Sequence, residues 1–188
     1  LIHGASANLR ELWGPLRELA DEFHLLAYDR PGMGHSTRPR GAESLAAQAR
    51  IAAAVIESAG PGPAILVGHS LGAAVALRVA LDRPDLVCGI VAVAPASHPY
   101  TGDNVWWARL SATPLFGQLF CATIIPAFGP LVAATGVANN FAPSSTPSGY
   151  FDDGGVGLIF RPRAFRASAR DVIATRREFA AQAPRYPE

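Results

Sequence analysis

The sequence contains no lysine, so its sixteen basic residues are all arginines, set against fifteen acidic residues. The resulting net charge of +1 is small for a chain of 188 residues. A nucleic-acid-binding domain needs a concentrated basic face to neutralise phosphates, and the composition supplies no such excess. The exclusive use of arginine indicates a bias of base composition more than a function. We therefore do not expect nucleic acid as a partner.

Cysteine is also scarce, since the chain has only Cys88 and Cys121, both in apolar surroundings. No His, Cys or carboxylate cluster has metal-ligand spacing, and phosphate-loop motifs are missing, so we expect neither a metal nor an organic cofactor. Two buried reduced thiols favour a reducing, cytoplasmic compartment, with a disulfide between them as the alternative. The chain opens without Met, and we expect its natural N-terminus, with any signal or anchor, to lie upstream.

Charge is missing altogether between Leu110 and Phe151. Within this stretch the apolar run from Leu115 to Ala138 is long enough to raise the question of a membrane span. Pro126 and Pro130, with several glycines, argue against one unbroken helix there. We expect an apolar lid over a substrate pocket, with a lipid-contacting lid or a membrane span as alternatives.

Short apolar runs alternate with helical patterns in the first half, which is typical of a parallel sheet with crossover helices. The expected strands are residues 1–3, 25–28, 64–67 and 87–94, and the expected helices are 9–20, 44–59 and 72–83. Within the last two strands, residues 65–67 and 90–93 are expected to be buried and central. From about Ala96 the alternation stops. We therefore predict an α/β core over residues 1–96 and a mostly helical lid over 97–188.

Six arginines fall between Arg161 and Arg177 and alternate with apolar residues at helical spacing. This pattern predicts an amphipathic helix with a solvated charged face. A docking patch for anionic groups is the alternative.

The segment Gly68-His69-Ser70-Leu71-Gly72 follows an apolar strand and opens a helix, which is the context of a nucleophile elbow. A strand that turns directly into a helix strains the serine backbone, and only small flanking residues let the two arms approach. We therefore expect Ser70 to be a catalytic nucleophile. The side chain of His69 is expected to point away from the working face of Ser70.

His3-Gly4-Ala5 ends the first expected strand, where a second oxyanion donor belongs in such a site. We expect the backbone N–H groups of Ala5 and Leu71 to form an oxyanion hole, with His3 in a structural role and Gly4 supporting the turn. Each such donor is worth roughly 3 kcal/mol of transition-state stabilisation.

Three motifs together resemble the α/β-hydrolase superfamily, in the branch of small esterases, C–C hydrolases and cofactor-free haloperoxidase-like proteins. They are His3-Gly4-Ala5, the loop from Tyr28 to Ser36, and Gly68 to Ala73. The resemblance covers about residues 1–95 and implies a three-layer core with a parallel sheet, here incomplete. It also implies that Asp29 is structural, in a tight turn made with Gly32 and Gly34.

The same resemblance places the triad acid after a later strand and the histidine after the last one. The chain stops first, so we expect both to lie beyond its C-terminus and the chain alone to be nearly inactive. Alternatives within the chain are Asp103 or Asp29 as the acid and His69 or His98 as the base.

A serine nucleophile limits the possible reactions to acyl transfer, because the serine attacks an acyl carbon. In the resembled superfamily, haloalkane dehalogenases and epoxide hydrolases attack with Asp, which argues against both activities. We expect a carboxylesterase-like hydrolase acting on a small hydrophobic ester or related acyl substrate, with C–C hydrolysis as a variant. The alternative is a non-catalytic ligand-binding or interaction protein that keeps the fold without a working triad.

Overall fold

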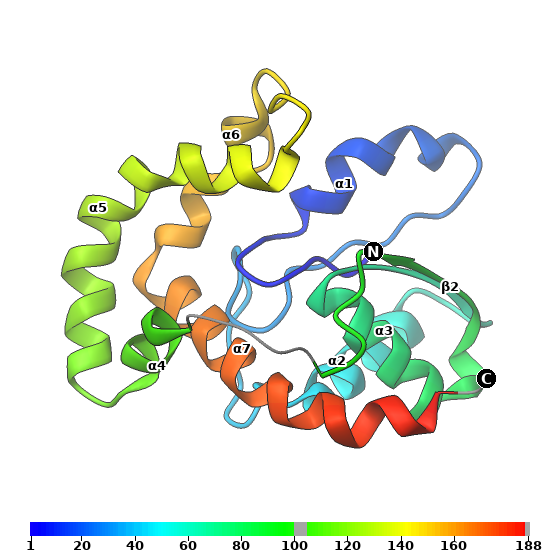
Figure 1. Ribbon diagram of the computed structural model, residues 1–188. Coiled ribbons are helices and arrows are strands. Elements are labelled where there is room, and N and C mark those ends of the chain that lie inside the picture. Colours follow the sequence, from blue (N-terminus) through cyan, green and yellow to red (C-terminus); the bar gives the residue numbers. More distant parts are fainter. Residues whose placement is uncertain (100–104, 187–188) are drawn as a thin grey trace.

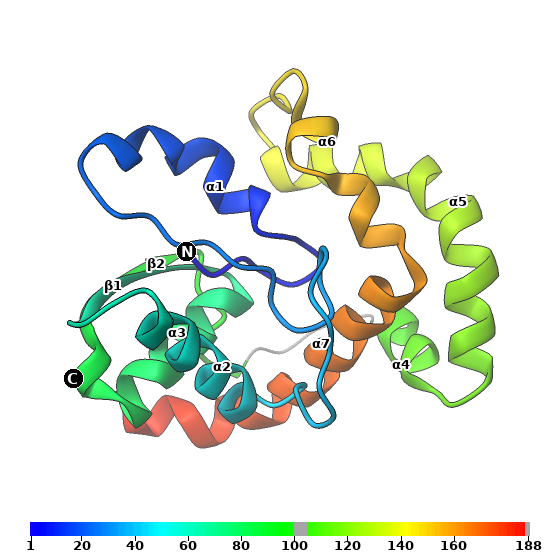
Figure 2. The same ribbon diagram turned by 180° about the vertical axis from the view of Figure 1, so that it is seen from behind.

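The computed structural model describes residues 1–99 and 105–186. At its centre β1 (Ala64–His69) and β2 (Val87–Val93) pair in parallel, with Leu66 opposite Ile90. Helices α2 (Leu45–Ser58) and α3 (Leu71–Asp82) pack together on one face, and η2 (Pro84–Leu86) leads into β2. Helix α1 (Arg10–Leu16), continued by η1 (Arg17–Asp21), lies over the other face (Figures 1 and 2). The parallel sheet with its crossover helices is what the strand–helix alternation predicted, and the three layers are those that the resemblance implied.

Two of the four expected strands are present only as single bridges. Ile2 pairs in parallel with both Tyr28 and Gly68, so residues 1–3 and 25–28 extend the sheet beside β1 without forming a ladder. The physical reason lies at His3, whose carbonyl accepts a hydrogen bond from Arg30 Nε at 2.9 Å instead of from a neighbouring strand. The prediction of full strands at these segments was therefore wrong in extent.

The helices of the first half follow local signals. Ser44 caps α2, because its side-chain oxygen accepts a hydrogen bond from Ala47 N at 3.1 Å. Helix α3 starts at Leu71, directly after Ser70 and one residue earlier than expected. The serine therefore stands at the junction between β1 and the N-terminus of α3.

The hydrophobic core lies between the sheet and helices α2 and α3. It contains Ile2, Leu45, Leu66, Leu71, Val75, Val79 and several alanines, and Phe179 joins it from the far end of the chain. The other face of the sheet is open, since Ile65, Val91 and Val93 are exposed. A cavity of about 640 Å³, lined partly by Leu16, Leu19 and Phe23, separates α1 and η1 from the strands. The expectation that both strands are buried was thus wrong for this face.

The second half is mostly helical. It comprises α4 (Trp106–Ala112), α5 (Phe116–Phe141), α6 (Tyr150–Asp153), η3 (Val156–Phe160), α7 (Pro162–Gln182) and η4 (Ala183–Arg185). Helix α5 runs through Pro126 and Pro130, which corrects the expectation that prolines would interrupt it. It bends on the way (Figure 1), because an interior proline kinks a helix without having to end it. Among the described residues, α5 is the helix long and apolar enough to cross a membrane.

Helix α7 joins the two halves of the molecule. It packs on α4 and α5, and further along it reaches the core. There Glu178 accepts a hydrogen bond from Leu45 N at 2.9 Å, and Gln182 Nε2 donates to Ala74 O at 3.0 Å. The arginine face of α7, which was expected to be solvated, is only partly so. Arg166 donates to the carbonyls of Ser111 and Thr113 at the end of α4. The division at residue 96 stays a prediction, with α7 in contact with both sides.

Candidate active site

Ser70 has the backbone geometry that a nucleophile elbow requires, with φ +50° and ψ −117°. Positive φ is costly for a residue with a Cβ, and it persists only where the surroundings impose it. Here Ser70 N donates to Val93 O at 3.0 Å, and Ser70 O accepts from Ala73 N and Ala96 N. These bonds to the end of β2 and to α3 fix the strained residue in a half-buried position.

The glycines on either side of Ser70 lie against other backbone segments. A Cβ on Gly68 would come within 2.6 Å of Ala73 Cα, and one on Gly72 within 2.0 Å of Ile2 O. Neither position has room for a side chain. The contact at Gly72 also shows that α3 begins directly beside residues 2–3.

The predicted oxyanion loop lies beside the predicted nucleophile. A Cβ on Gly4 would lie 3.3 Å from Ser70 Cβ and 3.0 Å from His69 Nδ1. Gly4 N and Ser6 N donate to the side chains of Glu11 and Ser168, at 2.7 and 2.9 Å. Ala5 N–H, between them, makes no hydrogen bond within residues 1–99 and 105–186. Leu71 is the first residue of α3, where a helix leaves its N–H groups free.

His3 supports this loop from below. Its ring is buried, Nδ1–H donates to Gly4 O at 2.9 Å, and Nε2 accepts from Arg30 N at 2.9 Å. Burial, aided by the positive charge of Arg30, holds the pKa of His3 well below its usual value. The ring therefore stays neutral, and its contacts are with backbone groups of the loop.

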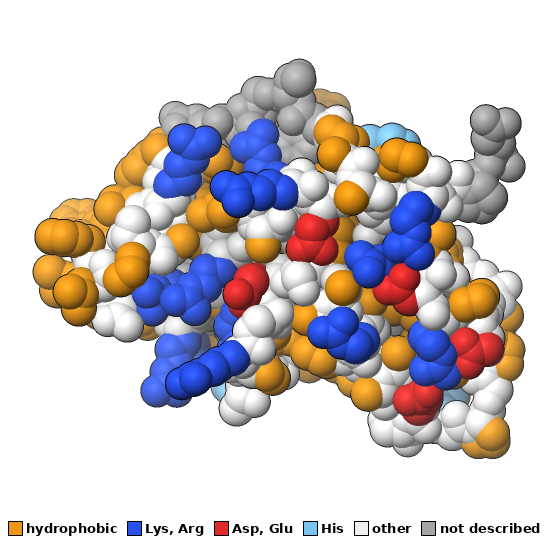
Figure 3. Space-filling model, turned by 90° about the horizontal axis from the view of Figure 1, so that it is seen from below, with side chains coloured by type: hydrophobic (Ala, Val, Ile, Leu, Met, Phe, Trp, Pro, Cys, Tyr) orange, Lys and Arg blue, Asp and Glu red, His pale blue; other side chains and the backbone are white. Residues whose placement is uncertain are grey.

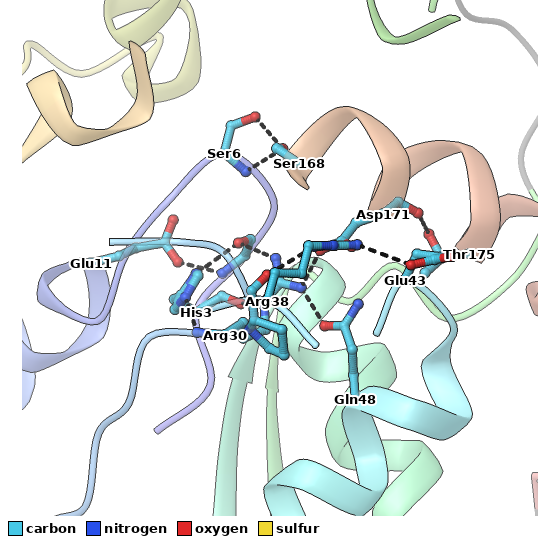
Figure 4. Close-up of polar contacts among 12 residues, drawn as sticks. His3, Ser6, Glu11, Arg30, Arg38, Glu43, Gln48, Ser168, Asp171 and Thr175 are labelled. Carbon is cyan, nitrogen blue, oxygen red and sulfur yellow. Dashed lines mark hydrogen bonds and ion pairs between the residues drawn. The ribbon is translucent and has the colours of Figure 1, made fainter. Parts of the chain in front are cut away.

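A buried ion network ties the loop to α7 (Figure 4). Arg30 Nη1 lies 3.0 Å from Asp171 Oδ2, Arg30 Nη2 donates to Gly4 O at 2.8 Å, and Gln48 Oε1 accepts from the same guanidinium. Arg38 Nη2 reaches the other oxygen of Asp171 at 2.6 Å. Sequence reasoning missed this network. Its signal was Asp171, the one acidic residue between Arg161 and Arg177.

Glu11, from the first turn of α1, is a second residue that sequence reasoning missed. The oxygen that accepts from Gly4 N also lies 3.1 Å from His69 Nδ1. This contact raises the pKa of His69, although burial acts in the opposite direction. Glu11 therefore links α1, the oxyanion loop and the elbow. An acidic residue in a first helical turn is common, so no signal for this role is visible in the sequence.

The other candidate triad members have different partners. Asp29 accepts hydrogen bonds from Leu9 N at 2.8 Å and His35 N at 2.9 Å, as expected of a structural turn residue. His98 Nδ1 lies 2.9 Å from Ser97 Oγ. Asp103 lies outside the described residues. No histidine side chain of the described chain hydrogen-bonds to Ser70.

The cysteines differ from expectation in one respect. Both are free, so they form no disulfide, and Cys121 is buried whereas Cys88 is exposed. Cys88 lies on β2, the strand that also carries the exposed Val91 and Val93. The described residues include no group of three or more His, Cys, Asp or Glu side chains arranged to hold a metal.

A three-layer α/β architecture with a strained serine between a strand and a helix defines the class of hydrolase-fold proteins. A model of the alpha/beta hydrolase family matches residues 1–187, and the chain belongs to this family.

The chain is similar to proteins of several activities. It is 35% identical over 104 residues to the "Dihydrolipoyllysine-residue acetyltransferase component of acetoin cleaving system" of Cupriavidus necator. The aligned region covers 55% of this chain and 27% of that protein. It is 36% identical over 96 residues to Lipase LipV of Mycobacterium tuberculosis, covering 50% of this chain and 36% of that protein. The chain thus spans about a third of the length of these relatives.

Among solved structures, the epoxide hydrolase CorEH resembles the chain with a TM-score of 0.74 at 18% identity, covering 97% of this chain and 68% of that one. At this identity the likeness shows the α/β-hydrolase fold alone.

Proposed function

We propose that the full-length protein containing this chain is a serine hydrolase with Ser70 as its nucleophile. The observation that carries the proposal is the strained Ser70 backbone, held between β1 and α3 beside the loop of residues 4–6. Ser70 Oγ attacks the acyl carbon, and the N–H groups of Ala5 and Leu71 donate to the oxyanion that develops. The positive end of α3 favours the same negative charge.

The covalent chemistry proceeds in two steps. A Ser70 Oγ–carbon bond forms while the alcohol leaves with a proton, and water then cleaves the acyl-enzyme. We place the base that moves these protons, and the acid that orients it, beyond Glu188. For this reason the 188-residue chain alone is expected to be nearly inactive.

The proposed substrate class is a small hydrophobic ester or related acyl compound. The uncharged segment between Leu110 and Phe151 supports it, since apolar walls favour apolar acyl or alcohol groups. The similarity to a protein named as a lipase supports ester chemistry. The variant within this class is C–C hydrolysis, in which Ser70 attacks a carbonyl next to the C–C bond that is cleaved.

A non-catalytic binding protein is the second candidate. The observation in its favour is that the described partners of Ser70 are backbone groups, without a histidine.

One experiment separates the candidates. The full-length protein is treated with a fluorophosphonate probe and assayed on p-nitrophenyl esters of graded acyl length, with Ser70→Ala as the test variant. We expect labelling at Ser70, and hydrolysis that falls by roughly 10⁴-fold or more in the variant. Ser58→Ala is the matched control, because Ser58 is an exposed serine at the end of α2.

Hydrolysis that survives Ser70→Ala would refute the nucleophile assignment. If the unaltered protein shows no labelling and no turnover, the result would favour the non-catalytic binding protein.

A further inference from the structure

Helix α5 is held by one narrow face. The buried residues along it recur at every fourth position and are Gly117, Cys121, Ile125, Gly129 and Ala133. The glycines let the helix approach closely, since a Cβ on Gly117 would meet Ser111 O at 2.4 Å and one on Gly129 would meet Phe160 at 2.3 Å. Contacts along this face reach α4, α7 and η3.

One exposed side of α5 carries large apolar side chains, whereas Gln118 and Thr123 are among the exposed polar residues of the helix. Six large side chains at its start and middle have exposed fractions between 57% and 77%, and we call them the apolar lid surface: Leu115, Phe116, Leu119, Phe128, Leu131 and Val132. Figure 3 shows hydrophobic side chains gathered at this end of the molecule. Apolar residues gathered on an exposed surface mark a site of protein or membrane contact.

The charge of the lid complements an anionic surface. Residues 97–188 carry eight arginines and six acidic residues, whereas residues 1–96 carry eight arginines and nine acidic residues. Figure 3 shows arginine side chains beside the hydrophobic end. Exposed Arg109 on α4 and Arg163 on α7 flank the uncharged segment in the sequence. Apolar side chains with a cationic rim suit the boundary between acyl chains and anionic headgroups.

We propose that the apolar lid surface docks on a lipid bilayer that carries anionic headgroups. Helix α5 lies along the interface and does not cross it, because its buried face is fixed to α4 and α7. Anionic lipid fits better than a second copy, because the arginines beside this surface complement headgroup charge, whereas a second copy would bring the same positive charge against them. This inference does not depend on the hydrolase activity.

The test is flotation of the full-length protein with vesicles of phosphatidylcholine alone or mixed with phosphatidylglycerol. We expect flotation with the mixed vesicles, weaker flotation without phosphatidylglycerol, and weakening by salt. Trp106, which is exposed on α4 next to α5, supplies a second readout through a blue shift of its fluorescence.

The double variant Leu119→Glu, Leu131→Glu is expected to lower vesicle partitioning about tenfold or more, since it removes two apolar side chains and adds negative charge. Phe23→Glu is the matched control, because Phe23 is 52% exposed but lies after η1, outside the lid. Unchanged thermal melting of both variants would show that they fold.

Three results would overturn the proposal. The first is no flotation on either vesicle. The second is a dimer that the double variant abolishes without any vesicle binding, which would assign the surface to a second copy. The third is equal loss of binding in Phe23→Glu.

Discussion

At the residue scale, the geometry of Ser70 depends on neighbours without side chains. The serine takes positive φ where β1 ends, and α3 starts so close to residues 2–3 that Gly72 touches Ile2 O. The motif is therefore a steric requirement of this junction as well as a chemical signature.

We predict that Gly72→Ala destabilises the protein by about 1–3 kcal/mol, because the added Cβ has no space beside Ile2 O. The matched control is Gly136→Ala in α5, where nothing lies within 4 Å of the added Cβ. That change is expected to be neutral or to stabilise by up to about 1 kcal/mol. Urea denaturation midpoints measure both, and equal effects would contradict the steric explanation.

The pair of Glu11 and His69 gives stability a pH dependence. In the folded protein, the contact with Glu11 raises the pKa of His69 above the unfolded value of 6.5. The stabilisation is therefore fully present below the unfolded pKa and is lost as pH rises through the folded pKa. We predict that Glu11→Gln removes this contribution, so that the stability lost is larger at pH 5 than at pH 9.

NMR titration of the His69 ring measures this effect directly. Its pKa should fall in Glu11→Gln, and an unchanged titration would show that the carboxylate does not govern it.

At the scale of elements, α7 is the part that binds lid to core. Asp171 pairs with both Arg30 and Arg38, and all three side chains are largely buried. A buried ion pair offers little net stability against an apolar replacement, but removing one partner leaves an unpaired charge.

We predict that Asp171→Asn destabilises the protein by about 3–5 kcal/mol, because Arg30 remains buried without its counter-ion. The control is Glu57→Gln, which breaks the exposed pair with Arg83 at 2.9 Å and should change the unfolding midpoint little. Thermal unfolding followed by circular dichroism compares the two. A small effect at Asp171 would contradict the prediction and would mean that the other contacts of α7 hold it in place.

Elements set by local sequence signals were predicted well, whereas elements that depend on contacts distant in the sequence were not. Helix α2 was predicted within one residue of its bounds at each end, because Ser44 caps one end and glycines and prolines follow the other. Residues 1–3 and 25–28 were over-predicted, because apolar runs do not reveal that His3 O bonds to Arg30. Helix α5 was under-predicted, because a proline inside a helix can be accommodated by a bend.

At the scale of the whole molecule, two faces of apolar residues lie open. One is the sheet face of Ile65, Val91 and Val93, and the other is the apolar lid surface. They lie on different parts of the chain, and only the lid carries excess positive charge. This difference in charge is why we assign an anionic bilayer to the lid surface and no partner to the sheet face.

The sequence by itself determined the order of strands and helices and the elbow at Ser70, because periodicity and the Gly-x-Ser-x-Gly motif act over a few neighbouring residues. The tertiary structure alone decided that Glu11 meets His69 and that Arg30 meets Asp171, 141 residues apart. It also decided which side of α5 is buried. Such contacts depend on how whole elements pack, and no local backbone preference specifies them.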